Sequence, residues 1–264
     1  MKSFLIDNNN VADYAAKIAA WIREKVIQAR CKGVVFGMSG GIDCSVAARL
    51  CQVGGVDVHL VMMPYGDGMV KSKSQEHAME LIEKFHFPYH VFDIKPAVDA
   101  LTIPVDAPCL EDSDAARSGA FEISQANIRP RVRMTYLYQF AQLNSRLVLG
   151  TSNLSEITVG YCTKWGDGAC DLQPIASLTK QEVYVLARYL DIPASIIQKA
   201  PSAELWEGQT DEDELGLSYC QIDDFILHGT TGKPETDRKI TDRMAMSAHK
   251  REAIPFYDGI AIKK

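Results

Sequence analysis

Short apolar runs alternate with helical patterns along this chain of 264 residues, and that alternation limits the possible fold more than any other feature. Five runs are typical of buried parallel strands: Val34–Met38, Val56–Met63, His90–Ile94, Leu147–Gly150 and, as the weakest, Leu172–Ala176. Strands that are separated by helices form βαβ units, which keep the strands parallel. We therefore expect an α/β fold with a mostly parallel open sheet of about five strands and helices on both faces.

The segments between these runs repeat their apolar residues at helical spacing. In the first segment Asn10 is a candidate cap, and five residues share one face: Val11, Tyr14, Ile18, Ile22 and Val26. Further helical patterns cover Ser45–Gln52, Ser74–Phe85, Ile123–Asn144 and Leu178–Ile192. In the last of these, Thr179 and Glu182 have the spacing of a capping box.

Two acidic segments are expected to be loops: Asp99–Gly119, which contains prolines, and Pro201–Gly216, which has little helical period. Loops of this length in a compact domain are more often functional lids than simple connections. From Leu217 to Lys264 the pattern is helical and then irregular. There is no internal repeat, so we predict a single domain over residues 1–264.

Charge and composition exclude several classes of protein. The net charge is −6, which argues against a nucleic-acid carrier built on broad positive potential. No apolar run is long enough to span a bilayer, and the first residues lack a signal-peptide core. The seven cysteines are scattered and contain no C-x-x-C pair, so a disulfide framework or zinc site has little support. We expect a cytoplasmic protein with reduced cysteines and neither nucleic-acid nor membrane partners.

The stretch "MSGGID", Met38–Asp43, directly follows the first predicted strand and leads into a helix. Glycines let backbone N–H groups converge on an anion, and the helix directs its positive end to the same place. Asp43 would repel phosphate by itself but suits a Mg²⁺ ion that bridges carboxylate and phosphate oxygens. The loop lacks the lysine of a P-loop and the spacing of a dinucleotide fingerprint. A simple tight turn between strand and helix is the alternative.

The S-G-G-x-D pattern resembles the pyrophosphate loop of the N-type ATP pyrophosphatases. These enzymes cleave ATP between the α- and β-phosphates, adenylylate a substrate and hold the pyrophosphate that leaves. The resemblance implies an adenine nucleotide alpha hydrolase-like, Rossmann-like fold, with ATP as co-substrate. It also accounts for the missing lysine, because the family does not transfer a γ-phosphoryl group.

Longer segments resemble the ammonia-dependent NAD synthetases; they are Asn127–Met134, Gly150–Pro193, Pro201–Gly216 and His249–Arg251. The resemblance implies conversion of deamido-NAD, ATP and ammonia into NAD, AMP and pyrophosphate, with Mg²⁺ as cofactor. Glutamine-using relatives carry an additional amidase domain, for which this chain has no room, so we expect free ammonia as the nitrogen donor. The resemblance also implies a homodimer with substrate sites at the subunit boundary.

The same resemblance assigns roles to individual residues. It implies that Asp43 and Glu156 are magnesium ligands, and that Asp43, Lys180 and Asp171 are catalytic. The implied ATP site contains Gly37, Met38, Ser39, Gly40, Gly41, Ile42, Asp43, Cys44, Thr151, Lys180 and Ser202. The implied deamido-NAD site contains Arg131, Lys164, Asp171, His249 and Lys250. Lys180 would supply the positive charge that the loop lacks, and Asp171 would either orient the nicotinate ring or help to deprotonate ammonium.

Three features depart from the family pattern. Cys44 replaces the usual serine, so a weaker donor stands near the pyrophosphate, and the neighbouring Ser45 is expected to point elsewhere. Pro130 replaces the usual alanine and is expected to break the helix or to start it at Arg131. The tail from Glu252 matches only loosely, which makes His249 and Lys250 less secure.

Other functions stay open from the sequence alone. Within the superfamily, the alternatives are the amination domain of GMP synthetase and a tRNA-thiolating enzyme, although thiolation usually requires paired cysteines and a basic surface. A different class is a non-catalytic module that only senses ATP. Carboxylates at both Asp43 and Glu156 count against a sensor, because a sensor does not need to activate an α-phosphate.

Overall fold

The computed structural model describes residues 4–66, 72–104, 120–201 and 210–257. Its sheet contains four strands in the order β3-β2-β1-β4, all of them parallel. The strands are β1 (Gly33–Gly37), β2 (Asp57–Met62), β3 (Tyr89–Val91) and β4 (Arg146–Val148). The α/β class and the parallel sheet are therefore confirmed, and each of these strands overlaps a predicted run.

The expected fifth strand is wrong. Of Leu172–Ala176, only Leu172 pairs with the sheet, through an isolated parallel bridge to Leu149. The chain then enters a turn from Pro174. Proline has no amide hydrogen for a ladder, and so the pairing ends after one residue.

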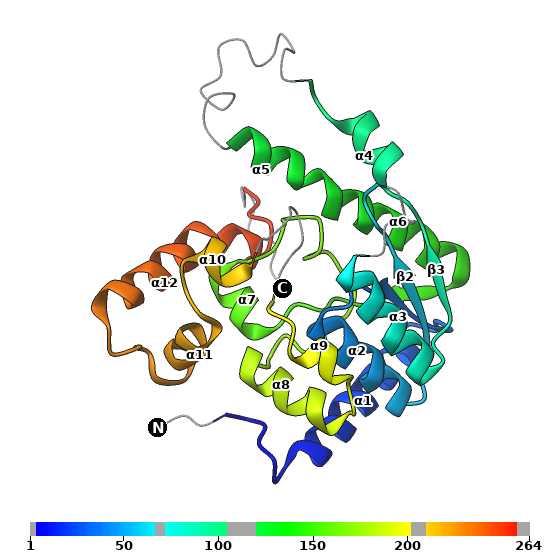
Figure 1. Ribbon diagram of the computed structural model, residues 1–264, viewed down its shortest axis with the longest axis horizontal. Coiled ribbons are helices and arrows are strands. Elements are labelled where there is room, and N and C mark those ends of the chain that lie inside the picture. Colours follow the sequence, from blue (N-terminus) through cyan, green and yellow to red (C-terminus); the bar gives the residue numbers. More distant parts are fainter. Residues whose placement is uncertain (1–3, 67–71, 105–119, 202–209, 258–264) are drawn as a thin grey trace.

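Helices cover both faces of the sheet (Figure 1), and the alternation of β1 side chains explains why. Val34 and Phe36 point into the larger core, beneath α1 (Val11–Gln28), α2 (Ile42–Val53), α3 (Lys73–Phe85) and α8 (Lys180–Tyr189). Val35 points into the opposite core, beneath α4 (Lys95–Leu101) and α6 (Ile128–Asn144). Both faces of β1 are thus buried, as a continuous apolar run predicts.

The predicted helices are present with small shifts. The long pattern from Ile123 to Asn144 is split at Asn127 into α5 (Ala120–Ala126) and α6. Pro130 lies in the first turn of α6 and does not start the helix at Arg131. A first-turn proline is tolerated because that amide has no partner within the helix.

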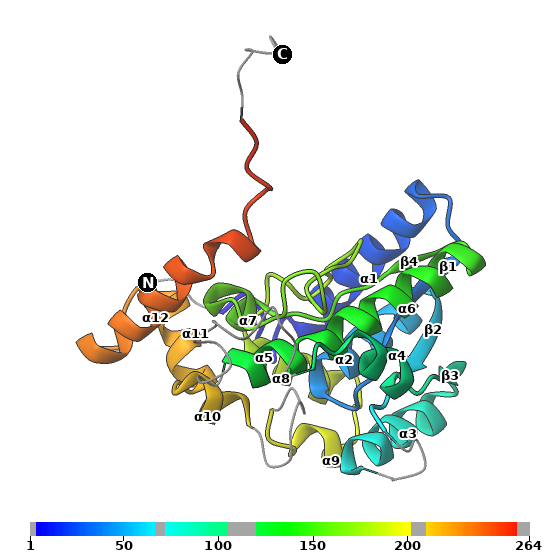
Figure 2. The ribbon, with the colours of Figure 1, turned by 90° about the horizontal axis from the view of Figure 1, so that it is seen from above.

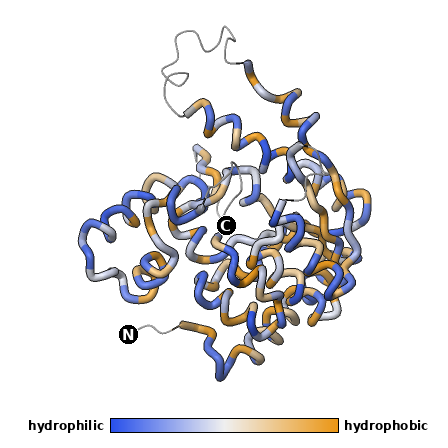
Figure 3. The backbone as a smooth tube through the Cα atoms, in the orientation of Figure 1, coloured by the Kyte–Doolittle hydropathy of each residue, from blue (hydrophilic) through white to orange (hydrophobic). Residues whose placement is uncertain are grey.

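The remaining helices follow β4 and flank the carboxyl end of the sheet. They are α7 (Leu154–Val159), α9 (Ala194–Ile197), α10 (Asp211–Leu215), α11 (Tyr219–His228), α12 (Pro234–Met246) and the 3₁₀ helix η3 (Ala248–Lys250). A small third core joins α7 to α11 and α12 through Val159, Ile222 and Ile240. The residues of α12 are largely hydrophilic (Figure 3), and the chain after η3 extends away from the body (Figure 2). None of the described helices is long and apolar enough to cross a membrane.

Candidate active site

The glycine loop lies between β1 and α2, at the carboxyl end of the central strand. Gly40 has φ +77°, and a Cβ built there would lie 2.1 Å from the carbonyl oxygen of Ser74 in α3. Only glycine satisfies both the backbone angle and the close contact. Gly41 is the N-cap of α2, and its own N–H donates to Ser39 Oγ at 3.3 Å. The loop is thus held against α3 and opens onto the N-terminus of α2, where anions bind favourably.

Two carboxylates and one lysine from three different helices meet beside this loop. Lys180 Nζ lies 2.6 Å from Asp43 Oδ2 and 3.3 Å from Glu156 Oε1. The side chain of Lys180 is 3% exposed, while those of Asp43 and Glu156 are 17% and 15% exposed. Lys180 is 137 positions from Asp43 and 24 positions from Glu156 in the sequence, yet the three side chains form one nearly buried ionic cluster.

Helix caps position the three charged groups. Asn153 is the N-cap of α7 and forms a capping box with Glu156. Its side-chain amide also donates to Asp43 Oδ1 at 2.9 Å, which fixes both carboxylates relative to one another. Thr179 forms the predicted capping box with Glu182 at the start of α8, and Lys180 is the first residue of that helix. The caps thereby fix where the side chains of Glu156 and Lys180 leave their helices.

A second layer of polar groups connects the cluster to the C-terminal helices. Tyr219 of α11 donates to Asp211 Oδ2 at 2.9 Å and to Glu156 Oε1 at 3.3 Å. Its ring lies 4.7 Å from Lys180 Nζ, within the range of a cation–π contact. Tyr161 donates to Asp211 Oδ1 at 3.0 Å, so both oxygens of that buried carboxyl group accept a hydrogen bond.

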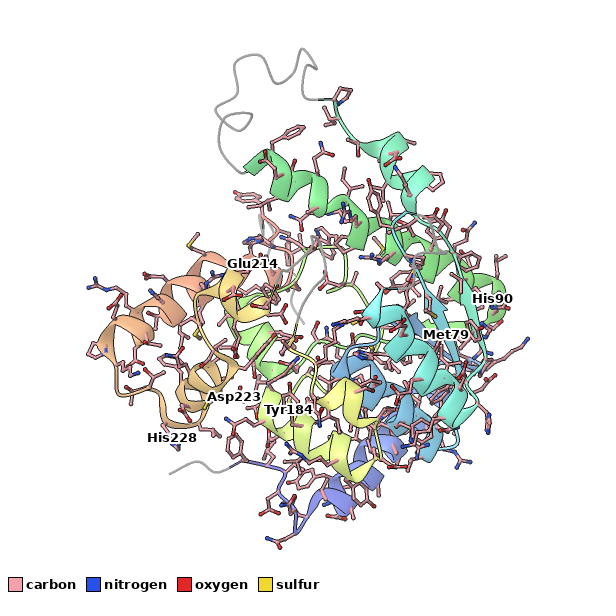
Figure 4. The ribbon with its side chains drawn as sticks, in the orientation of Figure 1. Met79, His90, Tyr184, Glu214, Asp223 and His228 are labelled. Carbon is pink, nitrogen blue, oxygen red and sulfur yellow. The ribbon has the colours of Figure 1, made fainter. Side chains whose placement is uncertain are left out.

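A buried carboxylate on α11 supports the starts of α7 and α8. Asp223, labelled in Figure 4, is fully buried and bonds to the hydroxyl of Ser155 in α7. It also accepts the N–H of Gln181 at 3.0 Å, while Ser155 Oγ accepts the N–H of Lys180 at 2.9 Å. Negative charge at the N-terminus of α8 is electrostatically favourable and helps to offset the positive charge of Lys180 at the same end.

Burial and mutual repulsion change the acidity of the cluster. Burial, and next the negative charge of Asp43, raise the pKa of Glu156 to about 7. Burial alone would lower the pKa of Lys180, but the carboxylates of Asp43 and Glu156 outweigh it and raise that pKa above its usual value. Lys180 is therefore a permanent cation, whereas Glu156 exchanges its proton near neutral pH.

A cavity of about 160 Å³ lies over the cluster. Its lining includes most of the predicted ATP residues: Ser39, Gly41, Ile42, Asp43, Cys44, Thr151 and Lys180. Gly37, Met38 and Gly40 form the strand end and the loop without lining the cavity. Ser202 lies outside the described residues.

Cys44 is buried at the start of α2 and its thiol faces the loop. Its Sγ lies 3.4 Å from Ser39 Oγ and 3.2 Å from the carbonyl oxygen of Gly41. Ser45 instead donates to the carbonyl oxygen of Gly41 at 2.7 Å and does not line the cavity. The expectation that Ser45 does not replace the missing hydroxyl agrees with this geometry.

The predicted substrate residues gather near η3, apart from one. Arg131 in α6 donates through Nε to the carbonyl oxygen of Lys164 at 3.3 Å, and Lys164 Nζ lies 3.2 Å from His249 Nδ1. Lys250 donates to the carbonyl oxygens of Gly160 and Cys162 at 2.8 and 2.7 Å. Four of the five predicted substrate residues thus come from segments that contact one another.

Asp171 lies elsewhere, alongside β4. Its carboxylate accepts the N–H of Val148 at 2.8 Å and the hydroxyl of Tyr138 at 3.2 Å. Within the described part of the chain, no hydrogen bond or ion pair joins Asp171 to the cluster of Asp43, Glu156 and Lys180.

The donor set suits a hard divalent cation whose ligands come partly from substrate. Among residues 4–66, 72–104, 120–201 and 210–257, no group of three or more His, Cys, Asp or Glu could hold a metal ion alone. Asp43 and Glu156 nevertheless present two adjacent carboxylates at the cavity. Mg²⁺ commonly uses one or two carboxylates together with phosphates and water, so the residues present fit that ion.

Sequence reasoning missed Asn153, Asp211 and Tyr219. Asn153 carries a signal, because Asn followed three residues later by Glu is the pattern of a helix N-terminus. Asp211 lies in the acidic segment Pro201–Gly216, whose resemblance to the family does not point to Asp211 itself. Tyr219 reaches Asp211 and the cluster through the packing of α11, for which its local sequence carries no signal.

The comparisons with known proteins agree with this geometry. The family model described as NAD synthase matches residues 14–254. An NH(3)-dependent NAD(+) synthetase from Syntrophomonas wolfei is 39% identical over 235 residues, which cover 89% of this chain and 91% of the relative.

Two solved structures cover nearly the whole chain. An NMN synthetase from Francisella tularensis has a TM-score of 0.83 and 35% identity, covering 94% of this chain and 98% of its own. An NH3-dependent NAD synthetase from Campylobacter jejuni, in complex with the nitrate ion, has a TM-score of 0.73 and 30% identity, with coverage of 96% and 99%. The parallel sheet, the glycine loop with its acidic cluster, and these similarities together lead to one conclusion: the chain belongs to the NAD synthase family.

Proposed function

We propose that this chain is an ammonia-dependent NAD(+) synthetase, a ligase that forms the carbon–nitrogen bond of the nicotinamide group. The observation that carries the proposal is the cluster of Asp43, Glu156 and Lys180 beside the glycine loop, in a member of the NAD synthase family. The substrates are deamido-NAD, ATP and ammonia, and the products are NAD, AMP and pyrophosphate.

The reaction needs ATP because a carboxylate is a poor electrophile. An oxygen of the nicotinate carboxylate attacks the α-phosphorus of ATP, and the bond to the β-phosphate oxygen breaks, which releases pyrophosphate. Ammonia then attacks the carbonyl carbon of the acyl adenylate, loses a proton, and expels AMP. Both steps bring anions together, so the site must offer positive charge and exclude water.

The described residues supply these functions in part. We assign the backbone N–H groups at the start of α2 to the phosphates, together with Ser39 and Thr151 at the cavity. Lys180 offsets negative charge at the α-phosphate, and its buried position between Asp43 and Glu156 fixes its direction. Asn153 and Tyr219 hold the two carboxylates in place and act as positioning residues.

We assign Asp43 and Glu156 to Mg²⁺. The ion supplies charge neutralisation at the phosphates when it is bound. In the metal-free protein the pKa of Glu156 is raised to about 7, and a metal ligand must be deprotonated, so binding of Mg²⁺ below that pH would release a proton.

Arg131, Lys164, His249 and Lys250 form what we call the substrate half of the site. We propose that this half lies at a boundary between two copies of the chain. Arg131 and His249 are exposed, and the segment from Glu252 to Tyr257 extends away from the body with large apolar side chains in water. Phe256 and Tyr257 are 81% and 96% exposed, an unfavourable arrangement for an isolated monomer. A homodimer would cover them, and light scattering on the purified protein would measure twice the monomer mass.

A second candidate is the synthesis of NMN, which contains the same carboxamide without the adenylyl half. It is favoured by the TM-score of 0.83 to the Francisella tularensis NMN synthetase, against 0.73 to the Campylobacter jejuni NAD synthetase. The chemistry at Asp43, Glu156 and Lys180 would be the same for both substrates.

One assay tests both candidates. The purified chain is incubated with ATP, Mg²⁺ and ammonium, and with either deamido-NAD or nicotinate mononucleotide, while NAD, NMN, AMP and pyrophosphate are quantified by chromatography. The main proposal expects a higher kcat/KM with deamido-NAD. A higher kcat/KM with the mononucleotide would replace it by the second candidate, and AMP release without either amide would contradict both.

A further inference from the structure

The carboxyl ends of α7 and α12 meet beside the substrate half of the site. Gly160 is the C-cap of α7 with φ +66°, and a Cβ built there would lie 2.1 Å from Cβ of Ser247, the C-cap of α12. Only glycine allows both the backbone angle and this close contact. Ser247 is also the residue from which η3 begins, so the contact between the two helix ends fixes where η3 starts.

The guanidinium group of Arg251, directly after η3, joins the same two helix ends. Its Nη1 donates to the carbonyl oxygen of Ile157 in α7 at 3.2 Å and to Ser247 Oγ at 2.7 Å. Its Nη2 donates to the carbonyl oxygen of Met244 in α12 at 2.6 Å. Both carbonyl groups lie in the last turn of their helices, where backbone partners are few and the helix carries partial negative charge. The rigid fork of arginine can bond to both helices at once.

The three residues of η3 present substrate residues but do not fix their own position, because a 3₁₀ turn of that length is only marginally stable alone. Lys250 Nζ donates to the carbonyl oxygens of Gly160 and Cys162, and His249 Nδ1 lies 3.2 Å from Lys164 Nζ. Lysine side chains are long and rotatable, so these contacts leave the backbone of η3 able to shift. A fixed position for η3 needs a bond from a more rigid group.

The opposite end of α7 is held independently of Arg251. Asn153 forms the capping box with Glu156 there, and the hydroxyl of Ser155 bonds to Asp223. Loss of the Arg251 side chain should therefore release η3 while Glu156 keeps its place in the ionic cluster. The effect of such a loss should fall on the substrate half and not on the nucleotide half.

We propose that Arg251 is a positioning residue for the substrate half: it anchors η3 to α7 and α12, and thereby sets His249 at the distance from Lys164 and Arg131 that the substrate needs. The bonds described for Arg251 all go to neutral oxygens of the chain itself, so it acts through η3. The consequence for deamido-NAD rests on the proposed function, whereas the anchoring of η3 does not.

Amide hydrogen exchange on the purified full chain tests the anchoring without any substrate. The N–H groups of residues 250 and 251 donate to the carbonyl oxygens of Ser247 and Ala248, both at 2.9 Å. In Arg251→Met these amides should exchange about tenfold faster than in wild type, because the turn opens more often, while the amides of α8 keep their rates. Unchanged exchange in η3, or equal acceleration in α8, would overturn the inference.

A matched control separates the anchoring of η3 from the general loss of an arginine. Arg243, in the last turn of α12, also donates to two backbone carbonyl oxygens, those of Glu214 and Leu215 at the end of α10. Arg243→Met therefore loses a comparable pair of bonds, but to a helix that does not hold η3. The amides of η3 should exchange at the wild-type rate in this variant. Equal acceleration in Arg243→Met and Arg251→Met would overturn the inference.

The kinetic counterpart connects the anchoring to the substrate. Arg251→Met should raise KM for deamido-NAD about tenfold, with kcat and KM for ATP within a few-fold of wild type, since Glu156 and Lys180 keep their places. Faster exchange in η3 with an unchanged KM for deamido-NAD would overturn the role in the substrate half. If wild type forms no amide, the proposed function fails, and the exchange rates still decide whether Arg251 anchors η3.

Discussion

The two halves of the candidate site are built in opposite ways. In the nucleotide half, Asp43, Glu156 and Lys180 are nearly buried and bonded to one another. In the substrate half, Arg131 and His249 are exposed, and the described bonds of Arg131 and Lys250 go to backbone carbonyl oxygens. Charged groups in a buried cluster need protein partners even without a ligand, whereas exposed charged groups are solvated by water until a ligand binds. We infer that the chain itself preorganises ATP binding, and that substrate or a second copy completes the other half.

Removing a charge from the nucleotide half should have the largest effect on activity, and so tests most directly whether the two halves differ. Asp43→Ala should lower the rate of pyrophosphate release by at least about a hundredfold, because it removes a proposed metal ligand and one partner of Lys180. The measurement is pyrophosphate release under saturating ATP, with circular dichroism to show that the fold survives. Turnover at the wild-type rate would refute the metal assignment.

The stability of the cluster gives the next largest effect. Lys180→Met leaves the carboxylates of Asp43 and Glu156 without their shared cation, which should cost roughly 3–5 kcal/mol of unfolding free energy. The matched control is Lys17→Met, since Lys17 pairs with Asp13 at 2.6 Å with side chains that are 64% and 66% exposed. That exposed pair should contribute far less to the free energy of unfolding, because water screens both charges. Denaturant unfolding of both variants measures the difference, and equal losses would remove the distinction between buried and exposed pairs.

The substrate half should respond differently to the loss of a cation. Arg131→Ala should raise KM for deamido-NAD about tenfold, because a contact between a guanidinium group and an anionic substrate is lost. KM for ATP and the melting temperature should stay near the wild-type values, since Arg131 is exposed and its described bond is to a single carbonyl oxygen. A comparable rise in KM for ATP would mean that the two halves are not separate.

A pH dependence of stability should be specific to the nucleotide half. The pKa of Glu156 rises from 4.5 to about 7 on folding, so between these values the folded state binds more protons than the unfolded state. Its contribution to stability is therefore complete below about pH 4.5 and is lost as the pH rises to about 7. Glu156→Gln should gain stability relative to wild type over this range in metal-free buffer, as measured by urea unfolding. A difference that does not change with pH would contradict the raised pKa.

The smallest expected effect concerns Cys44. Its thiol faces Ser39 and the loop, so Cys44→Ser places a stronger hydrogen-bond donor at the same position. The activity should stay the same or rise by a few-fold in steady-state assays. A large loss would show that the thiol has a role of its own, and protection of Cys44 by ATP against a thiol reagent would place it in the site.

The parts of the fold that depend on local pattern could be predicted from the sequence. Val34 and Phe36 belong to an apolar run that only a strand buried on both faces explains, and Thr179 with Glu182 marked the start of α8 correctly. The break at Asn127 could not be predicted in the same way. Its side chain is engaged by the hydroxyl of Thr163 at 2.6 Å, a contact between segments far apart in the chain.

The same limit applies to the site. Asp43 and Glu156 follow predicted strands, and the carboxyl ends of parallel strands meet at one edge, so their proximity was predictable. The distance from Lys180 to both carboxylates was not, because the start of α8 is also held by Asp223 of a later helix, which accepts the N–H of Gln181. Tyr219 and Asp211 enter through the packing of α10 and α11, which no local pattern encodes. The roles of the individual site residues stay predictions.

The connection of Tyr219 to Glu156 has a consequence for the order in which the protein is made. Every strand in the described part of the chain is complete by Val148, and the glycine loop is synthesised even earlier. Asp211 and Tyr219, which complete the hydrogen bonds of the acidic cluster, are made only after a further stretch of chain. A nascent chain that has emerged from the ribosome as far as α9 therefore holds the loop but not a finished cluster. Competence to bind nucleotide should arise late in translation, when α11 packs onto α7 and α8.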